Sequence, residues 1–103
     1  INDKAKFKSL SNFKRSVYGF KILVDVMHSS LDKSSKDLCT KEYLTKRVSS
    51  LASRATIINF INDQISFGSL IANTSSIDGR IKIITPSESL INDYQDWLDY
   101  LTK

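Results

Sequence analysis

A run of polar side chains after Ser53 has the spacing of one helix face. Arginine can donate two hydrogen bonds to guanine or phosphate, and asparagine can bond adenine through two atoms. Such residues reach base edges when the N-terminal half of a helix enters a major groove. Ser50 and Ser53 would add phosphate contacts through hydroxyl and backbone N–H groups. The candidate base-reading residues are Ser53, Arg54, Thr56, Asn59 and Asn62.

The helix that carries these residues needs a partner helix and a turn. Thr40 is a suitable N-cap for a helix over 41–49, and Ser53 caps the next helix. The segment 49–52 forms the turn between them, with Leu51 expected to hold it against the core. The sequence therefore predicts a helix-turn-helix over about 40–67. Side chains on or beside the first of these helices that would flank the DNA backbone are Lys41, Lys46 and Arg47.

Two short strands should follow, over 70–74 and 80–85, as a wing that spans about 70–86. Asp78 and Gly79 form a turn signal, because glycine can adopt positive φ. Arg80 would then lie at the hairpin tip, where it could approach a minor groove. Gly68 is expected to end the preceding helix.

Longer helices are predicted at each end of this unit, over about 11–31 and 87–101. In the first, the apolar positions recur at helical spacing and predict a buried face. Three further apolar residues, Tyr18, Ile22 and Leu23, widen this surface. A second copy of the chain could cover it, or it could be a wide core stripe in a monomer. Ser87 caps the last helix. The predicted buried face is Phe13, Val17, Phe20, Val24, Met27 and Leu31.

Length and charge agree with one domain over 1–103 that has an anionic partner. The chain carries 15 Lys+Arg against 11 Asp+Glu, a net charge of +4. Residues 1–54 hold 12 basic and 5 acidic side chains, and residues 55–103 hold 3 and 6. This polarity suits nucleic acid, although solvated helix faces would also explain it.

Residues for catalysis or metal binding are sparse. His28 is the single histidine and Cys39 the single cysteine, so neither a zinc site nor an internal disulfide is expected. The acidic residues of the last helix, Asp93, Asp96 and Asp99, are typical of a solvated face. We expect no enzyme activity and no cofactor. No apolar run has the length of a membrane span and no signal peptide is recognised, so a cytoplasmic protein is predicted.

Together the segment 53–57, Leu70-Ile71 and the wing sequence Asp78-Gly79-Arg80 resemble MarR-type transcriptional regulators. The resemblance covers roughly 40–85. It implies that the second helix of the motif enters the major groove and that Arg80 contacts the minor groove, supported by Asp78. It also implies a homodimer joined by the N- and C-terminal helices, and a cleft for a possible small-molecule effector.

The sequence thus predicts an α+β, mostly helical winged helix-turn-helix that binds double-stranded DNA selectively as a homodimer. The alternative is a winged-helix module that binds protein through its apolar helices and does not bind DNA. Phe60, at a position where MarR-type proteins often have a polar or basic residue, and the acidic last helix favour that alternative.

Overall fold

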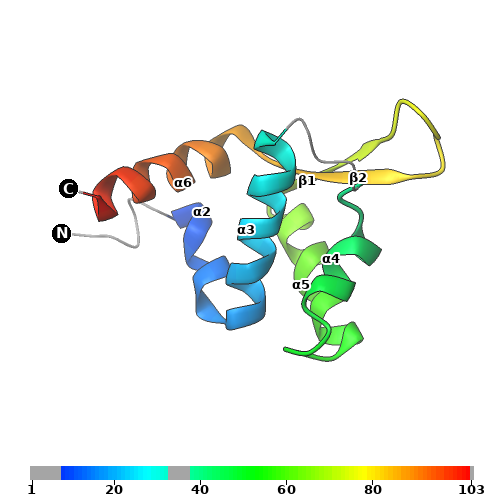
Figure 1. Ribbon diagram of the computed structural model, residues 1–103, viewed down its shortest axis with the longest axis horizontal. Coiled ribbons are helices and arrows are strands. Elements are labelled where there is room, and N and C mark those ends of the chain that lie inside the picture. The colour runs from blue at the N-terminus through cyan, green and yellow to red at the C-terminus, as the bar shows by residue number, and fades with distance from the viewer. Residues whose placement is uncertain (1–7, 33–37, 103) are drawn as a thin grey trace.

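Helices make up most of the structure, and one antiparallel hairpin completes it (Figure 1). The structure is a computed structural model that describes residues 8–32 and 38–102. Residues 1–7, most of the polar segment 32–37 and residue 103 lie outside these ranges. The elements in order are α2 (Lys8–Ser11), the 3-10 helix η1 (Phe13–Arg15), α3 (Val17–Leu31), α4 (Lys41–Arg47), α5 (Arg54–Ser66), β1 (Leu70–Thr74), β2 (Lys82–Pro86) and α6 (Glu88–Leu101). The predicted α+β, mostly helical class is confirmed.

Side-chain oxygens cap three helices at the residues expected from the sequence. The hydroxyl of Thr40 accepts a hydrogen bond from the backbone N–H of Tyr43 at the start of α4. Ser53 does the same for α5 and Ser87 for α6. Each cap satisfies a backbone donor that has no partner within its own helix. The predicted starts of these helices are therefore confirmed.

The end of α5 is fixed by Gly68, which has a φ of 84°. Its N–H donates to the carbonyl of Ile65, and the N–H of Ser69 donates to the carbonyl of Gln64. These two bonds form a Schellman motif, which favours glycine because an L side chain is strained at this φ. The motif turns the chain from α5 directly into β1.

The hairpin pairs Leu70 with Pro86 at its base and Thr74 with Lys82 near its tip. The second strand begins at Lys82, two residues later than predicted, because the turn extends through Arg80. Gly79 does not adopt the positive φ that was expected of it. The base of the hairpin is extended on its other edge, where the N–H of Ile84 donates to the carbonyl of Cys39 at 2.7 Å.

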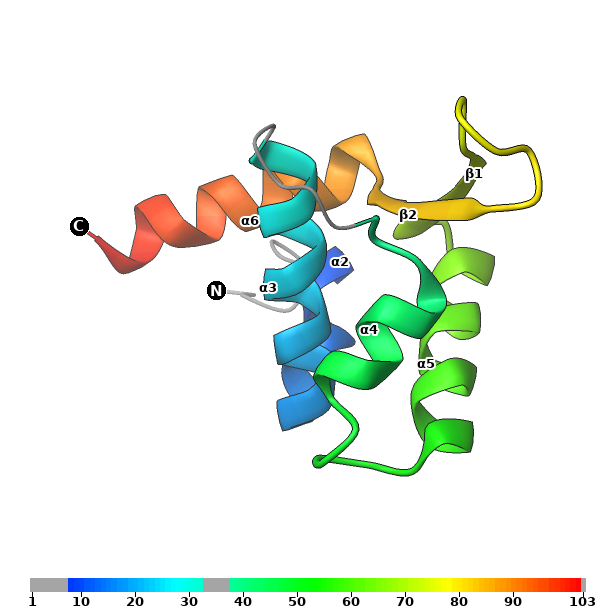
Figure 2. The same ribbon diagram turned by 45° about the vertical axis from the view of Figure 1, so that its right-hand side comes forward.

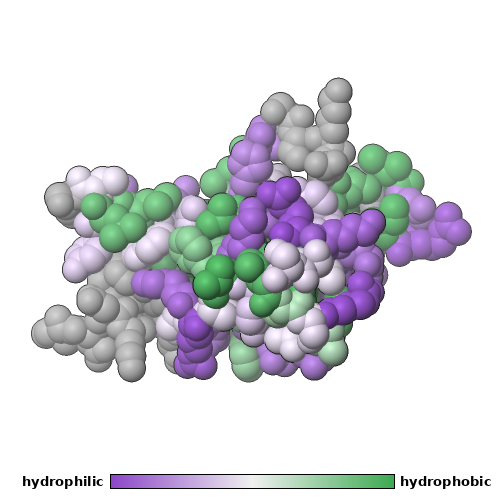
Figure 3. Space-filling view, turned by 60° about the horizontal axis from the view of Figure 1, so that its bottom comes forward, coloured by the Kyte–Doolittle hydropathy of each residue, from purple (hydrophilic) through white to green (hydrophobic). Residues whose placement is uncertain are grey.

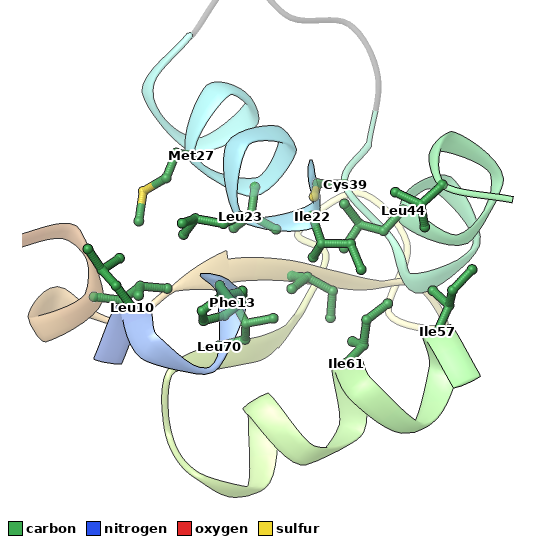
Figure 4. Close-up of a cluster of buried hydrophobic side chains, with 14 residues drawn as sticks. Leu10, Phe13, Ile22, Leu23, Met27, Cys39, Leu44, Ile57, Ile61 and Leu70 are labelled. Atoms are coloured by element: carbon green, nitrogen blue, oxygen red, sulfur yellow. The ribbon is translucent and has the colours of Figure 1, made fainter. Parts of the chain in front are cut away.

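One core lies between α3, the helix pair α4 and α5, and the base of the hairpin (Figure 4). It draws a few side chains from each element, so no helix is stabilised alone. The largest fully buried side chains are Leu10, Phe13, Ile22, Leu23, Val26, Met27, Leu44, Ile57, Ile61, Leu70, Ile84 and Leu90.

The buried face predicted for the N-terminal helix is only partly correct, because Phe13 and Met27 are buried but the other positions are not. Val17 is 73% exposed and Leu31 56% exposed, whereas Ile22 and Leu23 are fully buried. The cause is an interruption at Ser16, whose extended backbone separates η1 from α3. Phe13 is therefore out of helical phase with the residues after Ser16. Of the α3 positions in a stripe counted from it, only Met27 is fully buried.

The turn between α4 and α5 also differs from the prediction. Leu51, which was expected to hold this turn against the core, is 45% exposed. Val48 is fully buried instead, and its carbonyl accepts a hydrogen bond from the N–H of Leu51 at 2.9 Å. The turn is thus held by Val48, which precedes it and lies one helical turn after the buried Leu44.

The start of α3 approaches α5 closely at Gly19. A Cβ at this position would lie 2.9 Å from the Phe13 carbonyl oxygen and 3.2 Å from the Phe60 ring. The missing side chain lets Phe60 pack edge-on against both Phe13 and Tyr18, each with ring centroids 5.5 Å apart. Phe60 therefore joins α5 to the N-terminal segment.

We predict that Gly19→Ala lowers the free energy of unfolding by about 1–3 kcal/mol, because the added methyl group meets backbone and ring atoms. Urea unfolding followed by circular dichroism measures this. Gly79→Ala is the matched control, since the nearest atom to its new Cβ is 3.9 Å away. Equal losses of stability in the two variants would contradict the proposed steric cause.

Cys39 is buried, and burial raises the pKa of its thiol from 9.0 to about 11. The folded state thus keeps a proton that the unfolded state loses first. This contribution to stability is fully present below pH 9 and is lost as the pH rises toward 11. We predict that Cys39→Ala reduces the decline in unfolding free energy between pH 9 and 11. Parallel stability curves for the variant and the parent would refute this.

Candidate nucleic-acid interface

The outer face of α5 carries the polar residues that the sequence placed there. Ile57 and Ile61 point into the core, and the polar side chains on the opposite side of α5 face away from it. Figure 2 shows α5 along the side of the molecule below the hairpin. The predicted base-reading residues Ser53, Arg54, Thr56, Asn59 and Asn62 are all exposed.

Arg54 is engaged by an acidic residue that sequence reasoning did not assign to this surface. Its Nη1 donates to Oε2 of Glu42 at 2.9 Å, and its Nη2 donates to the other carboxylate oxygen. The hydrogen bonds from Arg54 lower the pKa of Glu42, and those to Glu42 raise the pKa of Arg54. Both side chains are more than half exposed, at 63% for Arg54 and 58% for Glu42. Glu42 and Arg54 are 12 residues apart on two different helices, so the periodicity of the sequence does not predict their contact.

A second bridge joins the same two helices. Nζ of Lys41 donates to Oδ1 of Asn62 at 2.7 Å. Both residues were predicted as separate DNA contacts, one for the backbone and one for a base. The structure brings them together, so they would approach a ligand as a pair.

Arg47 is turned toward the protein. Its Nε lies 3.0 Å from Oδ2 of Asp25, which is only 6% exposed, and its guanidinium lies over the Tyr43 ring. Lys21 donates to the other Asp25 oxygen at 3.0 Å. The N–H groups of Arg47 are not aligned with Oδ2, so this contact is an ion pair without a well-formed hydrogen bond. Arg47 thereby ties the end of α4 to α3.

Two of the predicted phosphate-contacting residues are exposed beside this network. Lys46 lies in the last turn of α4, one residue before Arg47. Ser50 is exposed in the turn that leads to α5. Both residues precede the N-terminus of α5 in the chain, and the positive end of a helix dipole favours a bound anion.

The hairpin tip holds Arg80 with its side chain 92% exposed. Oδ1 of Asp78 accepts from the backbone N–H of Arg80 at 3.0 Å and from its Nε at 3.3 Å, and Oδ2 accepts from Nη2 at 3.3 Å. The backbone bond and then the side-chain bonds lower the pKa of Asp78. The support of Arg80 by Asp78 that the family resemblance implies is therefore present as a contact.

Two further tip residues were not singled out from the sequence. Lys82 donates to the Thr74 hydroxyl across the hairpin at 2.7 Å, and Ile77 is 87% exposed. In Figure 3 hydrophilic and hydrophobic side chains lie next to each other at this end of the molecule. The alternation of residues along the strands predicts the position of Lys82. An exposed isoleucine in a turn has no such pattern.

An open hollow of about 770 Å³ lies between the start of α3 and the C-terminal half of α5. Arg15, Tyr18, Asp63 and Phe67 are among its lining residues. Gln64 also lines it, and its side-chain oxygen finds no hydrogen-bond partner among the described residues. That oxygen is closed off from solvent, so the hollow does not present it to a ligand.

The other residues considered for chemistry lie apart. His28 is exposed on α3, with Nε2 3.4 Å from Oδ2 of Asp32, and Cys39 is buried. Over residues 8–32 and 38–102, no three His, Cys, Asp or Glu side chains are grouped so that they could hold a metal ion. In the same ranges, no helix is both long and apolar enough to cross a membrane.

Comparisons with known proteins give no match to this chain. No family model matches the sequence, and no curated protein or solved structure is significantly similar to it. The functional inference therefore depends on the geometry of the chain itself.

We predict that Asp25→Asn lowers the free energy of unfolding by about 1–3 kcal/mol, because the buried amide cannot neutralise Lys21 and Arg47. Chemical denaturation at neutral pH measures the loss. Asp96→Asn, an exposed site on α6, removes the same charge and should change stability little. If the two variants are equally stable, the ion pairs of Asp25 do not hold α3 to α4.

Proposed function

We propose that this chain is a winged helix-turn-helix protein that binds double-stranded DNA selectively, as a homodimeric, MarR-like regulator of transcription. The observation that supports it most is the pairing of two features on one side of the molecule. The helix α5, whose polar residues are exposed, and the hairpin that carries Arg80 both lie away from the end of α6 (Figures 1 and 2). A helix and a neighbouring hairpin in this relation can enter adjacent grooves.

In the proposed complex, α5 lies in the major groove and its first turns face the bases. Arg54 and Asn59 would read base edges, while Lys46, Ser50 and Ser53 contact phosphates. Arg80 would approach the minor groove from the hairpin, with Asp78 holding its guanidinium. The exposed ion pairs at this surface contribute little to stability, so DNA can rearrange them at small cost.

The second copy in the proposed dimer covers an apolar face made by α3 and α6. Phe20 of α3 packs edge-on against Trp97 of α6, with ring centroids 5.9 Å apart. Leu31 on α3 remains 56% exposed, and Leu98 and Leu101 on α6 are 40% and 56% exposed. Figure 3 shows some hydrophobic side chains at the end of the molecule where α6 lies. A second α3–α6 face would remove these side chains from water.

The same apolar face is the observation that favours the alternative, a winged-helix module that binds a different protein. Of the two features cited for that alternative, the acidic last helix remains, whereas Phe60 packs between Phe13 and Tyr18 and is not an exposed docking residue. A module of this kind would not bind duplex DNA in a salt-dependent way, so DNA binding separates the two functions. A regulator of transcription would also act in the cytoplasm, as the sequence predicts.

We expect the protein to sediment at twice its chain mass of 11.7 kDa and to bind a random duplex with an affinity that falls steeply as salt rises. Fluorescence anisotropy at two salt concentrations measures the binding. On a duplex selected from a random library, Arg54→Ala should cost about 1–3 kcal/mol and relax the base preference.

Arg15→Ala is the control for the loss of one positive charge, because Arg15 is exposed in η1 and belongs neither to the proposed DNA contacts nor to the proposed α3–α6 dimer face. Its affinity should stay close to that of the parent. A folded protein that does not bind duplex DNA at low salt would exclude the proposed function and favour the protein-binding module.

A further inference from the structure

Glu42 places a negative charge on the surface that we propose contacts a polyanion. It lies in the first turn of α4 and grips the guanidinium of Arg54 through both carboxylate oxygens. An ion pair this exposed adds little to folding stability. A carboxylate in the first turn of a helix also interacts favourably with the helix dipole. Both effects on stability are small, so the effect of Glu42 on Arg54 is the property to consider.

The grip of Glu42 leaves part of Arg54 available. A guanidinium has five N–H groups, and Glu42 takes one on each terminal nitrogen. Three N–H groups remain, including the one on Nε. Any second acceptor for them must lie beside the carboxylate, within a few ångströms of its negative charge.

Phosphates and base edges meet that charge differently. A phosphate carries a full negative charge and is repelled by the carboxylate at this range. The O6 and N7 atoms of guanine belong to a neutral base, so they can accept from Arg54 with far less repulsion. The carboxylate can itself accept a hydrogen bond from the amino group of cytosine. Lys46, one helical turn after Glu42, is exposed and supplies a positive charge for the phosphates.

We propose that Glu42 is a specificity-determining residue that acts through Arg54, by favouring base edges over phosphates as partners for the guanidinium. Glu42 lowers the affinity for DNA of any sequence and preserves the preference for the correct one. This inference rests on the proposed DNA-binding function and deepens it.

The test compares Glu42→Gln with the parent on a random duplex and on a duplex selected for the parent. We expect the variant to bind the random duplex about three- to tenfold more tightly, because the repulsion of phosphates is lost. For this variant, the slope of the logarithm of the affinity against the logarithm of the salt concentration should steepen by about one unit, because Arg54 gains a phosphate contact. The affinity for the selected duplex should rise less. The ratio of the affinity for the selected duplex to the affinity for the random duplex therefore falls.

Two controls separate this effect from a change in total charge or in folding. Glu88→Gln makes the same substitution at an exposed site in the first turn of α6, and it should leave the ratio unchanged. Thermal unfolding should show Glu42→Gln to be as stable as the parent. The same measurements are then repeated with Glu42→Gln placed in the Arg54→Ala background.

The double variant decides whether Glu42 acts through Arg54. In the Arg54→Ala background, Glu42→Gln should no longer alter the ratio. A ratio that is unchanged in the single variant, or one that still falls without Arg54, overturns the inference while the DNA-binding function stands. If neither the parent nor Glu42→Gln binds duplex DNA at low salt, both the inference and the proposed function are wrong.

Discussion

The close contact of α3 with α5 at Gly19 is the constraint on which the other elements depend. Because no side chain projects there, the Phe60 ring can reach between Phe13 and Tyr18 and join α5 to η1 and α3, which are distant from it in sequence. That contact sets the rotation of α5 about its own axis, and the rotation decides which residues face outward. The polar surface of α5 is therefore a consequence of packing on its opposite side.

Charges in this protein fall into two groups that differ in what they do. The buried carboxylate of Asp25 holds Lys21 and Arg47, and it fixes the end of α4 to α3. If either cation were removed, water would have little access to the carboxylate to take its place. The pairs of Arg54 with Glu42 and of Arg80 with Asp78 are exposed, so water or another ligand can replace either partner at small cost. The net positive charge of the chain thus overstates the cations that are available on the proposed surface without rearrangement.

Local signals in the sequence predicted the fold well where neighbouring residues decide the structure. The caps at Thr40, Ser53 and Ser87 and the glycine after α5 all depend on residues within one turn. Prediction was wrong where a break in phase or a distant contact decides. The interruption at Ser16 shifted the buried face of α3 toward Ile22 and Leu23, and the burial of Val48 left Leu51 exposed. For the candidate site, exposure of the α5 residues could be predicted from periodicity. Their partners could not be predicted, because the contacts of Arg54 with Glu42 and of Lys41 with Asn62 join separate helices.

The hairpin has a fixed base and an unsupported outer half. At its base, Leu70 and Ile84 are buried and the N–H of Ile84 is bonded to Cys39, whereas every β1 residue after Leu70 is exposed. Backbone hydrogen bonds near the tip thus have no core behind them, and amides there belong to the part of a protein that opens most often by local fluctuation. The hairpin is thus anchored at its base only. In the proposed DNA complex, Arg80 at its tip can follow grooves of different width without any change in the packed domain.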